Sequence, residues 1–279
     1  MKRKLIISLF AVVFLAGLAI LLYPIISDSI NSRRQAQSVS RYFIGMGNLN
    51  QQDFTELFEA AHEYNEGLHR NPNRFIMSDD EDIEYRRLLN PLGTGAIGTL
   101  EIENIDVHLV IYHGTDEGVL QVGLGHFEGS SLPVGGPGTH AVITGHRGLP
   151  TSTLLTNLDR LVLGDTFNIN VLGDRLTYVV DQILTVLPHE TEELAIVPGY
   201  DYVTLVTCTP YGINTHRMLV RGYRADSDEE QLTSIRNAVI SGARLISGPV
   251  AALILLIPAL IVVAVMLCFN LRRIYKRGI

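Results

Sequence analysis

Cysteine is scarce in this sequence, with two residues in a chain of 279. Cys268 lies inside an apolar run near the C-terminus, which leaves Cys208 as the only thiol between the two apolar ends of the chain. An intramolecular disulfide is therefore excluded from that central segment. A cysteine without a partner is either a buried, inert hydrophobe or a reactive thiol, and composition alone leaves both interpretations open.

Charged residues are absent from two apolar runs, 5–26 and 250–269. Each has about the 20 residues that a helix needs to cross a bilayer. No small-x-small cleavage site follows the first run, which favours an uncleaved anchor over a signal peptide. Basic residues flank the runs on their terminal sides, at 2–4 and 272–277. We therefore expect a multi-pass protein of the cell membrane, with both termini in the cytoplasm and the central segment outside.

Basic residues are also scarce between these runs. Seven of the 22 Lys and Arg lie in the terminal tails, so the central segment keeps 15 against 29 Asp and Glu, a net charge of −14. Such an acidic surface repels a phosphate backbone, which argues against nucleic acid as a partner. The central segment of roughly 220 residues is long enough for one substantial hydrophobic core with an appendage.

A helix is predicted after residue 53. Apolar side chains recur there at helical spacing, at Phe54, Leu57, Phe58, Ala61, Tyr64 and Leu68. Asp53 and Glu56 have the spacing of a capping box, with Asp53 as the N-cap. The acidic run 79–82 that follows is too polar for a core. It is typical of a solvated face, and the alternative is a flap over a cleft.

Beyond residue 96 the pattern changes to that of strands, with little helix between them. Eight short runs are predicted as strands: 98–102, 107–112, 141–144, 166–171, 176–180, 182–187, 202–206 and 218–220. They favour a mainly β fold, a closed or nearly closed β-barrel. The expected parts are a cytoplasmic tip with the first membrane helix (1–27), a helical region with a lid (28–96), the barrel (97–226), a linker (227–249), and a second membrane helix with a basic tail (250–279).

Cys208 and Arg217 frame the loop between the last two predicted strands. Pro210, Gly212 and Asn214 interrupt the strand pattern between them. A loop of this length can bend back so that the thiol and the guanidinium face one cleft. Burying an arginine in a strand is costly unless it serves such a purpose, although an ordinary surface ion pair remains the alternative for Arg217.

A cysteine acts as a nucleophile only as the thiolate, so it needs a base or a cation nearby. Of the nine histidines, His216 is adjacent to the arginine, and neighbouring residues of a strand face opposite sides. His140 and His146 remain, at the two ends of one predicted strand. His146 is the stronger candidate, because it lies in a glycine-flanked loop from which a side chain can project at the end of a barrel.

The stretch Thr-Cys-Thr-Pro-Tyr-Gly-Ile-Asn-Thr-His-Arg, at 207–217, resembles the cysteine-to-arginine signature of the sortases, and of class C in particular. Further matches lie at 98–105, 111–115, 125–136 and 139–150. The two membrane runs are also similar to those of this class. The resemblance implies a sortase-type β-barrel with a His-Cys-Arg triad, which maps onto His146, Cys208 and Arg217.

Class C sortases polymerise pilins, and the resemblance implies the same reaction here. An LPXTG-like sorting signal is cleaved after Thr, held as a thioacyl enzyme, and passed to a lysine amine of the next pilin, without a metal or other cofactor. Thr207 and Thr209 flank the nucleophile and are candidates for positioning substrate, the alternative being ordinary strand-end threonines.

Two other functions are weighed against pilin polymerisation. Within the family, a wall-anchoring sortase would use an amine of a peptidoglycan precursor as acceptor. From another class, a non-enzymatic surface protein would carry its own sorting signal before an apolar span and a basic tail. No LPXTG-like pentapeptide precedes residue 250, which argues against the surface protein.

The segment before the barrel departs from the family's pattern. Class C lids insert an Asp-Pro-aromatic motif into the cleft, and no Asp-Pro dipeptide occurs between Arg70 and Asn90. Arg74, Phe75 and the acidic run stand in its place. We therefore expect a mobile lid over 71–90 that inhibits only weakly.

Overall fold

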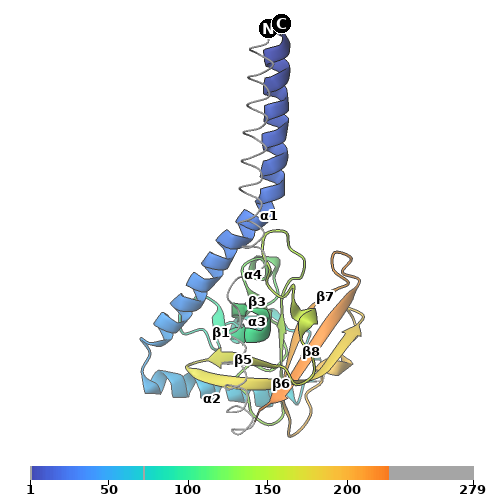
Figure 1. Ribbon diagram of the computed structural model, residues 1–279. Helices are drawn as coiled ribbons and strands as arrows, with labels where there is room; N and C mark the ends of the chain where they lie inside the picture. Colours follow the sequence, from blue (N-terminus) through green and yellow to red (C-terminus); the bar gives the residue numbers. More distant parts are fainter. Residues whose placement is uncertain (1, 72, 226–279) are drawn as a thin grey trace. The chain divides into compact units, whose positions relative to one another are not determined.

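The computed structural model describes residues 2–71 and 73–225. The predicted linker and second membrane helix lie outside the described residues. The expected closed barrel is confirmed, with strands joined in the order β1-β2-β3-β4-β7-β8-β6-β5 (Figure 1). The strands are β1 (Ala96–Ile102), β2 (Val107–His113), β3 (Leu124–His126), β4 (Thr139–Thr144), β5 (Thr166–Val171), β6 (Asp174–Val186), β7 (Asp201–Thr209) and β8 (His216–Arg224).

Two of the neighbouring strand pairs are parallel, β2 with β3 and β4 with β7, and the others are antiparallel. Alternation along the strands fills the interior. In β1, Leu100 and Ile102 are fully buried, whereas Glu101 between them reaches Arg175 at 3.1 Å. Burial of each large aliphatic side chain contributes about 1.5–3 kcal/mol. The barrel is therefore held by the inward-facing residues of all its strands.

Eight strands are predicted and eight are present among the residues that the structure describes, but the two sets differ. Two of the predicted strands are parts of one strand, β6. The runs 176–180 and 182–187 form one strand, and its register against β8 shifts between Val180 and Gln182. Asp181 lies at that irregularity and pairs with Arg221 at 2.7 Å. The missing eighth strand is β3, which has three residues with a glycine at its centre and therefore no readable alternation.

The first helix, α1 (Lys2–Met46), contains the first apolar run and continues well beyond it. It is the one helix in the described part of the chain that is long and apolar enough to cross a membrane. Its C-terminal half docks on the barrel. The Tyr42 hydroxyl donates to the carbonyl of Ile97 and accepts from the amide of Leu172, both at 3.2 Å. Asp28 accepts a hydrogen bond from the amide of Thr153 at 2.8 Å.

Helix α2 (Gln51–Leu68) begins earlier than predicted. Its N-cap is Asn50, and the capping box joins Asn50 to Asp53, so the prediction of Asp53 as the N-cap was wrong. Asp and Asn are both good N-caps, and the local spacing did not separate them. The buried Asn65 holds α2 to the barrel, because its side chain bonds both the amide and the carbonyl of Leu132.

The acidic run forms most of a short helix, α3 (Asp79–Tyr85). Ser78 is its N-cap and shares a capping box with Glu81. Carboxylates in a first turn interact favourably with the positive end of the helix dipole, which explains a helix in so polar a stretch. The fully buried Tyr85 ends it, and its hydroxyl lies 2.8 Å from Nδ1 of His126. The remaining α-helix in the described ranges is α4 (Glu117–Leu120), between β2 and β3.

Candidate active site

Strand register brings His146, Cys208 and Arg217 to one level of the barrel. In the antiparallel pair β7–β8, Cys208 lies directly opposite Arg217. In the parallel pair β4–β7, Thr144 lies opposite Val206, and continuing this register by two residues sets His146 level with Cys208. Strands β7 and β8 and the turn that follows β4 therefore place an imidazole, a thiol and a guanidinium at the same end of the sheet.

The turn that carries His146 is fixed by its neighbours. A Cβ atom at Gly145 would come within 2.6 Å of Leu124 and 2.9 Å of Leu155, so this position requires glycine. The hydroxyl of Thr207 donates to the carbonyl of Gly145 at 2.8 Å, and its side chain is buried. Thr207 is thus turned away from solvent, and its contact holds the His146 turn against β7.

Arg147 ties the same turn to the β7–β8 hairpin. Its guanidinium pairs with Asp159, donates to the hydroxyl of Thr209 at 3.5 Å, and lies 6.0 Å from the ring centre of Tyr211. The side chain is 9% exposed. The structure therefore gives Thr209 a partner at the strand end. These placements favour packing roles for Thr207 and Thr209 over direct substrate contact.

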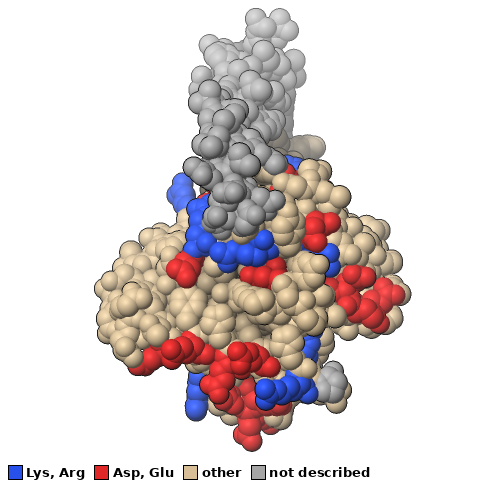
Figure 2. Space-filling view, turned by 90° about the horizontal axis from the view of Figure 1, so that it is seen from below, with Lys and Arg blue, Asp and Glu red and all other residues tan. Residues whose placement is uncertain are grey.

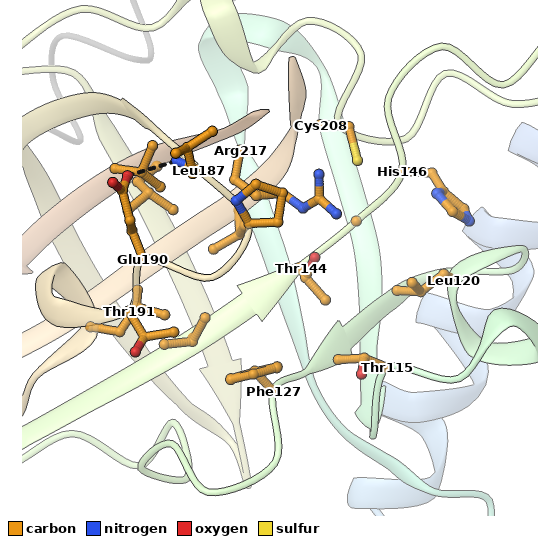
Figure 3. A pocket seen from close by; sticks show the side chains of 17 residues that line it. Thr115, Leu120, Phe127, Thr144, His146, Leu187, Glu190, Thr191, Cys208 and Arg217 are labelled. Carbon is orange, nitrogen blue, oxygen red and sulfur yellow. Dashed lines mark hydrogen bonds between the residues drawn. The ribbon is translucent and has the colours of Figure 1, made fainter. Parts of the chain in front are cut away.

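A cleft of about 380 Å³ opens beside the three residues (Figure 3). In that view the Cys208 sulfur lies between the Arg217 guanidinium and the His146 imidazole. Apolar side chains make up much of its wall, namely Leu120, Phe127, Val142, Val186, Leu187, Leu194, Val206 and Leu219. The volume and the largely apolar wall of the cleft are those of a ligand site, with Cys208, His146 and Arg217 among its lining.

Arg217 presents its guanidinium without a carboxylate partner among the described residues. Its Nη1 donates to the backbone carbonyls of Asn214 at 3.3 Å and His216 at 3.2 Å. These bonds orient the side chain and leave the other N–H groups of the guanidinium available as donors. Since arginine stays protonated, such a group can stabilise negative charge that develops on a carbonyl oxygen.

His146 has a carboxylate neighbour that sequence reasoning missed. Its Nε2 lies 3.4 Å from Oε2 of Glu117, the first residue of α4. Gln121 donates to the other carboxylate oxygen of Glu117. The hydrogen bond from Gln121 and, secondarily, the charge of His146 lower the pKa of Glu117. No motif marks this contact, because 29 residues separate its members.

His140, the weaker candidate, lies outside this site. It is 1% exposed, with Nδ1 2.8 Å from the carbonyl of Ala195 and Nε2 2.7 Å from the hydroxyl of Thr204. Burial lowers its pKa to about 4. Both ring nitrogens already have partners, so His140 serves the core. Within the described residues, no group of three or more His, Cys, Asp or Glu side chains is arranged to hold a metal ion.

A thiol, an imidazole and a guanidinium around one open cleft define a class of protein, the cysteine enzymes that transfer acyl groups. The sortase domain family matches residues 100–225. The chain is 43% identical to sortase C1 from Streptococcus agalactiae, covering 69% of this chain and all of that one with a TM-score of 0.66.

Two further sortases are also similar to this chain. Sortase C1 of GBS Pilus Island 1 is 41% identical, with 69% of this chain and 92% of that one covered and a TM-score of 0.63. Sortase D from Bacillus subtilis is 30% identical over 116 residues, 38% of this chain, and the match spans 56% of that protein's length. The chain belongs to the sortase family, in its class C, and is a cysteine transpeptidase.

Proposed function

We propose that this protein is a membrane-anchored transpeptidase that assembles pili. It cleaves an LPXTG-like sorting signal after Thr and joins the new carboxyl end to a lysine amine of a pilin. The observation that carries the proposal is the alignment of Cys208 with Arg217 across β7–β8, level with His146, at the end of an apolar cleft. The name of one similar protein, from a pilus island, supports the choice of pilin as acceptor.

The three side chains divide the reaction between them. The sulfur of Cys208 attacks the Thr carbonyl carbon; a carbon–sulfur bond forms, the Thr–Gly amide bond breaks, and His146 protonates the departing amine. Arg217 donates to the carbonyl oxygen while it carries negative charge. The lysine amine then attacks the thioester, His146 takes a proton from it, and the sulfur leaves as thiolate.

The charge of the protein favours a lysine-bearing acceptor. The segment between the apolar runs carries the net charge of −14 derived above. Figure 2 shows acidic side chains gathered in several groups on one face. A surface of this sign attracts a lysine-bearing partner and speeds its approach at low salt.

The decisive experiment incubates the full-length protein in detergent with a purified pilin. We expect covalent ladders on a denaturing gel, spaced by the mass of one pilin. A pilin without its acceptor lysine is the matched control and should stop at the thioacyl enzyme. Release of pilin onto a peptidoglycan-precursor amine with no ladders would show wall anchoring instead, and no thioacyl enzyme at all would refute the proposal.

The membrane arrangement is part of this proposal. The first apolar run lies in α1, whose apolar window has no buried residue, as expected for a helix that faces lipid. We propose that it anchors the protein with its N-terminus in the cytoplasm and the barrel outside, and that the second apolar run returns the chain to the cytoplasm. Protease digestion of intact cells, with antibodies to each end, would locate both termini.

The lid is anchored more firmly than the sequence indicates. Arg74 donates to the carbonyl of Gly129 at 3.0 Å and to that of Leu194 at 2.8 Å. Its guanidinium covers the ring of Phe75 at 4.2 Å, and that ring lies 5.3 Å from the ring of Phe127. Phe127 and Leu194 line the cleft. We propose that Arg74 and Phe75 replace the missing Asp-Pro-aromatic anchor and close the apolar end of the cleft.

Replacing Phe75 with alanine should therefore raise kcat/KM for a sorting-signal peptide about three- to tenfold, because the half-buried ring contributes on the order of 1 kcal/mol to closure. Ile76→Ala is the matched control, since that neighbouring side chain is 79% exposed. Equal rates for the two variants and the parent would show that the segment is no barrier to substrate.

A further inference from the structure

Glu117 contacts the histidine of the site from an element that the proposed mechanism does not use. The Nε2 atom of His146 is buried and makes no hydrogen bond within the described residues, but Oε2 of Glu117 lies 3.4 Å away. This distance lies just beyond that of an ordinary hydrogen bond, so a small rotation of either side chain completes one. Hydrogen bonds in catalytic sites often tighten only when substrate binds.

The position of Glu117 follows from the barrel's topology. β2 and β3 pair in parallel, so the chain must cross from the end of one to the start of the other, and α4 lies in that crossover. Thr115 and Leu120, on either side of Glu117, line the cleft. In Figure 3, Leu120 and His146 lie on the same side of the view. The crossover therefore delivers the carboxylate to the rim of the active site.

The two oxygens of the Glu117 carboxylate face different groups. Gln121, one helical turn on, donates to its Oε1, which leaves Oε2 for His146. The other charged groups around the site have different partners or positions. Arg147 pairs with Asp159, and Asp116 pairs with Arg86 at 3.4 Å. Cys208 and Arg217 lie together across β7–β8.

We propose that Glu117 is a positioning residue for His146. Its carboxylate accepts the Nε2–H of the imidazole, which fixes the tautomer and leaves Nδ1 to exchange protons with the sulfur of Cys208, the leaving amine and the incoming amine. It also stabilises the imidazolium that exists while His146 holds the proton. A base oriented by a third group is the general logic of activated nucleophiles. The proposal rests on the proposed role of His146.

The test compares Glu117→Gln with the parent protein in turnover of a sorting-signal peptide. Because the Glu117 side chain is 69% exposed, solvent weakens the pair, and kcat should fall about fivefold. KM should not change, because Glu117 acts on the imidazole and makes no contact with the peptide. Asp116→Asn is the matched control: it removes the same charge one residue away and should keep kcat within twofold.

A second measurement separates positioning from a structural role. The rate of Cys208 alkylation by iodoacetamide is measured in a Cys268→Ala background, with and without His146→Ala. Glu117→Gln should slow alkylation about fivefold when His146 is present and have no effect when it is absent. The same slowing in both backgrounds would mean that the substitution merely perturbs α4, and would overturn the proposal.

Two outcomes distinguish the role of His146 from that of Glu117. If His146→Ala retains full turnover, the proposed role of His146 is wrong, whatever Glu117 does. If His146→Ala abolishes turnover while Glu117→Gln keeps the parent kcat, the mechanism stands and the positioning role of Glu117 is refuted.

Discussion

Replacing Cys208 with alanine is expected to abolish the thioacyl intermediate and to lower turnover of an LPXTG-like peptide by at least about 10³-fold. The sulfur is the atom that forms the covalent bond, and the hydroxyls of both chain neighbours have other partners: Thr207 donates to the carbonyl of Gly145, and Thr209 accepts from Arg147. Intact-mass spectrometry of the full-length protein after incubation with the peptide would show the adduct in the parent and its absence in the variant.

The chain offers a matched control, because Cys268 is its only other cysteine. Cys268→Ala should form the adduct at the parent's rate. The fold of Cys208→Ala should survive, since the half-buried side chain loses one heavy atom at a strand end, and we expect a change in unfolding free energy of about 1 kcal/mol or less. An alanine variant that still carries peptide mass would remove Cys208 from the mechanism.

The site was predictable from sequence to the extent that it depends on local chemistry and strand register. Cys208 and Arg217 flank one hairpin loop, so their pairing across β7–β8 follows from the loop's length. Placing His146 beside them required knowing that β4 pairs in parallel with β7, a contact between strands nearly 60 residues apart. The sequence prediction selected His146 by a weaker criterion, namely that it lies in a loop at the end of a predicted strand.

What sequence reasoning missed depends on contacts between distant segments. Glu117 meets His146 because a crossover passes the cleft, and Phe75 meets Phe127 because the lid folds back on the barrel. Neither pair has a spacing that a local pattern can reveal. At Asp181 a local pattern misled the prediction. A charged residue between two apolar runs predicts the end of a strand, but Asp181 lies within β6, where the register against β8 shifts and Arg221 pairs with it.

Acid should destabilise this protein more than its carboxylates alone would suggest, because three histidines, His113, His126 and His140, are buried, and burial lowers the pKa of each. Burial lowers the pKa of His126 to about 3 and that of His140 to about 4. Neutral rings satisfy the hydrogen bonds at both positions: Nε2 of His126 lies 2.8 Å from the carbonyl of Ser131, and Nδ1 faces the Tyr85 hydroxyl. In His140, one nitrogen faces a carbonyl and the other a hydroxyl.

The sign of the effect follows from proton uptake. Histidine in the unfolded chain has a pKa of about 6.5, so below that pH the unfolded state binds protons that the folded state does not, and stability falls as the pH is lowered towards the folded pKa values. At pH 5 His126 and His140 each cost on the order of 2 kcal/mol relative to pH 7.5, or about 4 kcal/mol together, and His113 acts in the same direction. Burial raises the pKa of Asp201, which opposes this trend only as the pH approaches that carboxyl's own titration.

Urea unfolding of the full-length protein in detergent, followed at pH 7.5 and pH 5, measures this difference. His140→Gln should reduce it by about 2 kcal/mol, because one of the titrating rings is gone, and His126→Gln should do the same if the variant folds. His108→Gln is the matched control, since the His108 side chain is 50% exposed, and should leave the difference as in the parent. If the unfolding free energy is the same at both pH values, the buried rings do not titrate as their burial requires. If instead His140→Gln and His108→Gln behave alike, the acid sensitivity arises outside the buried histidines.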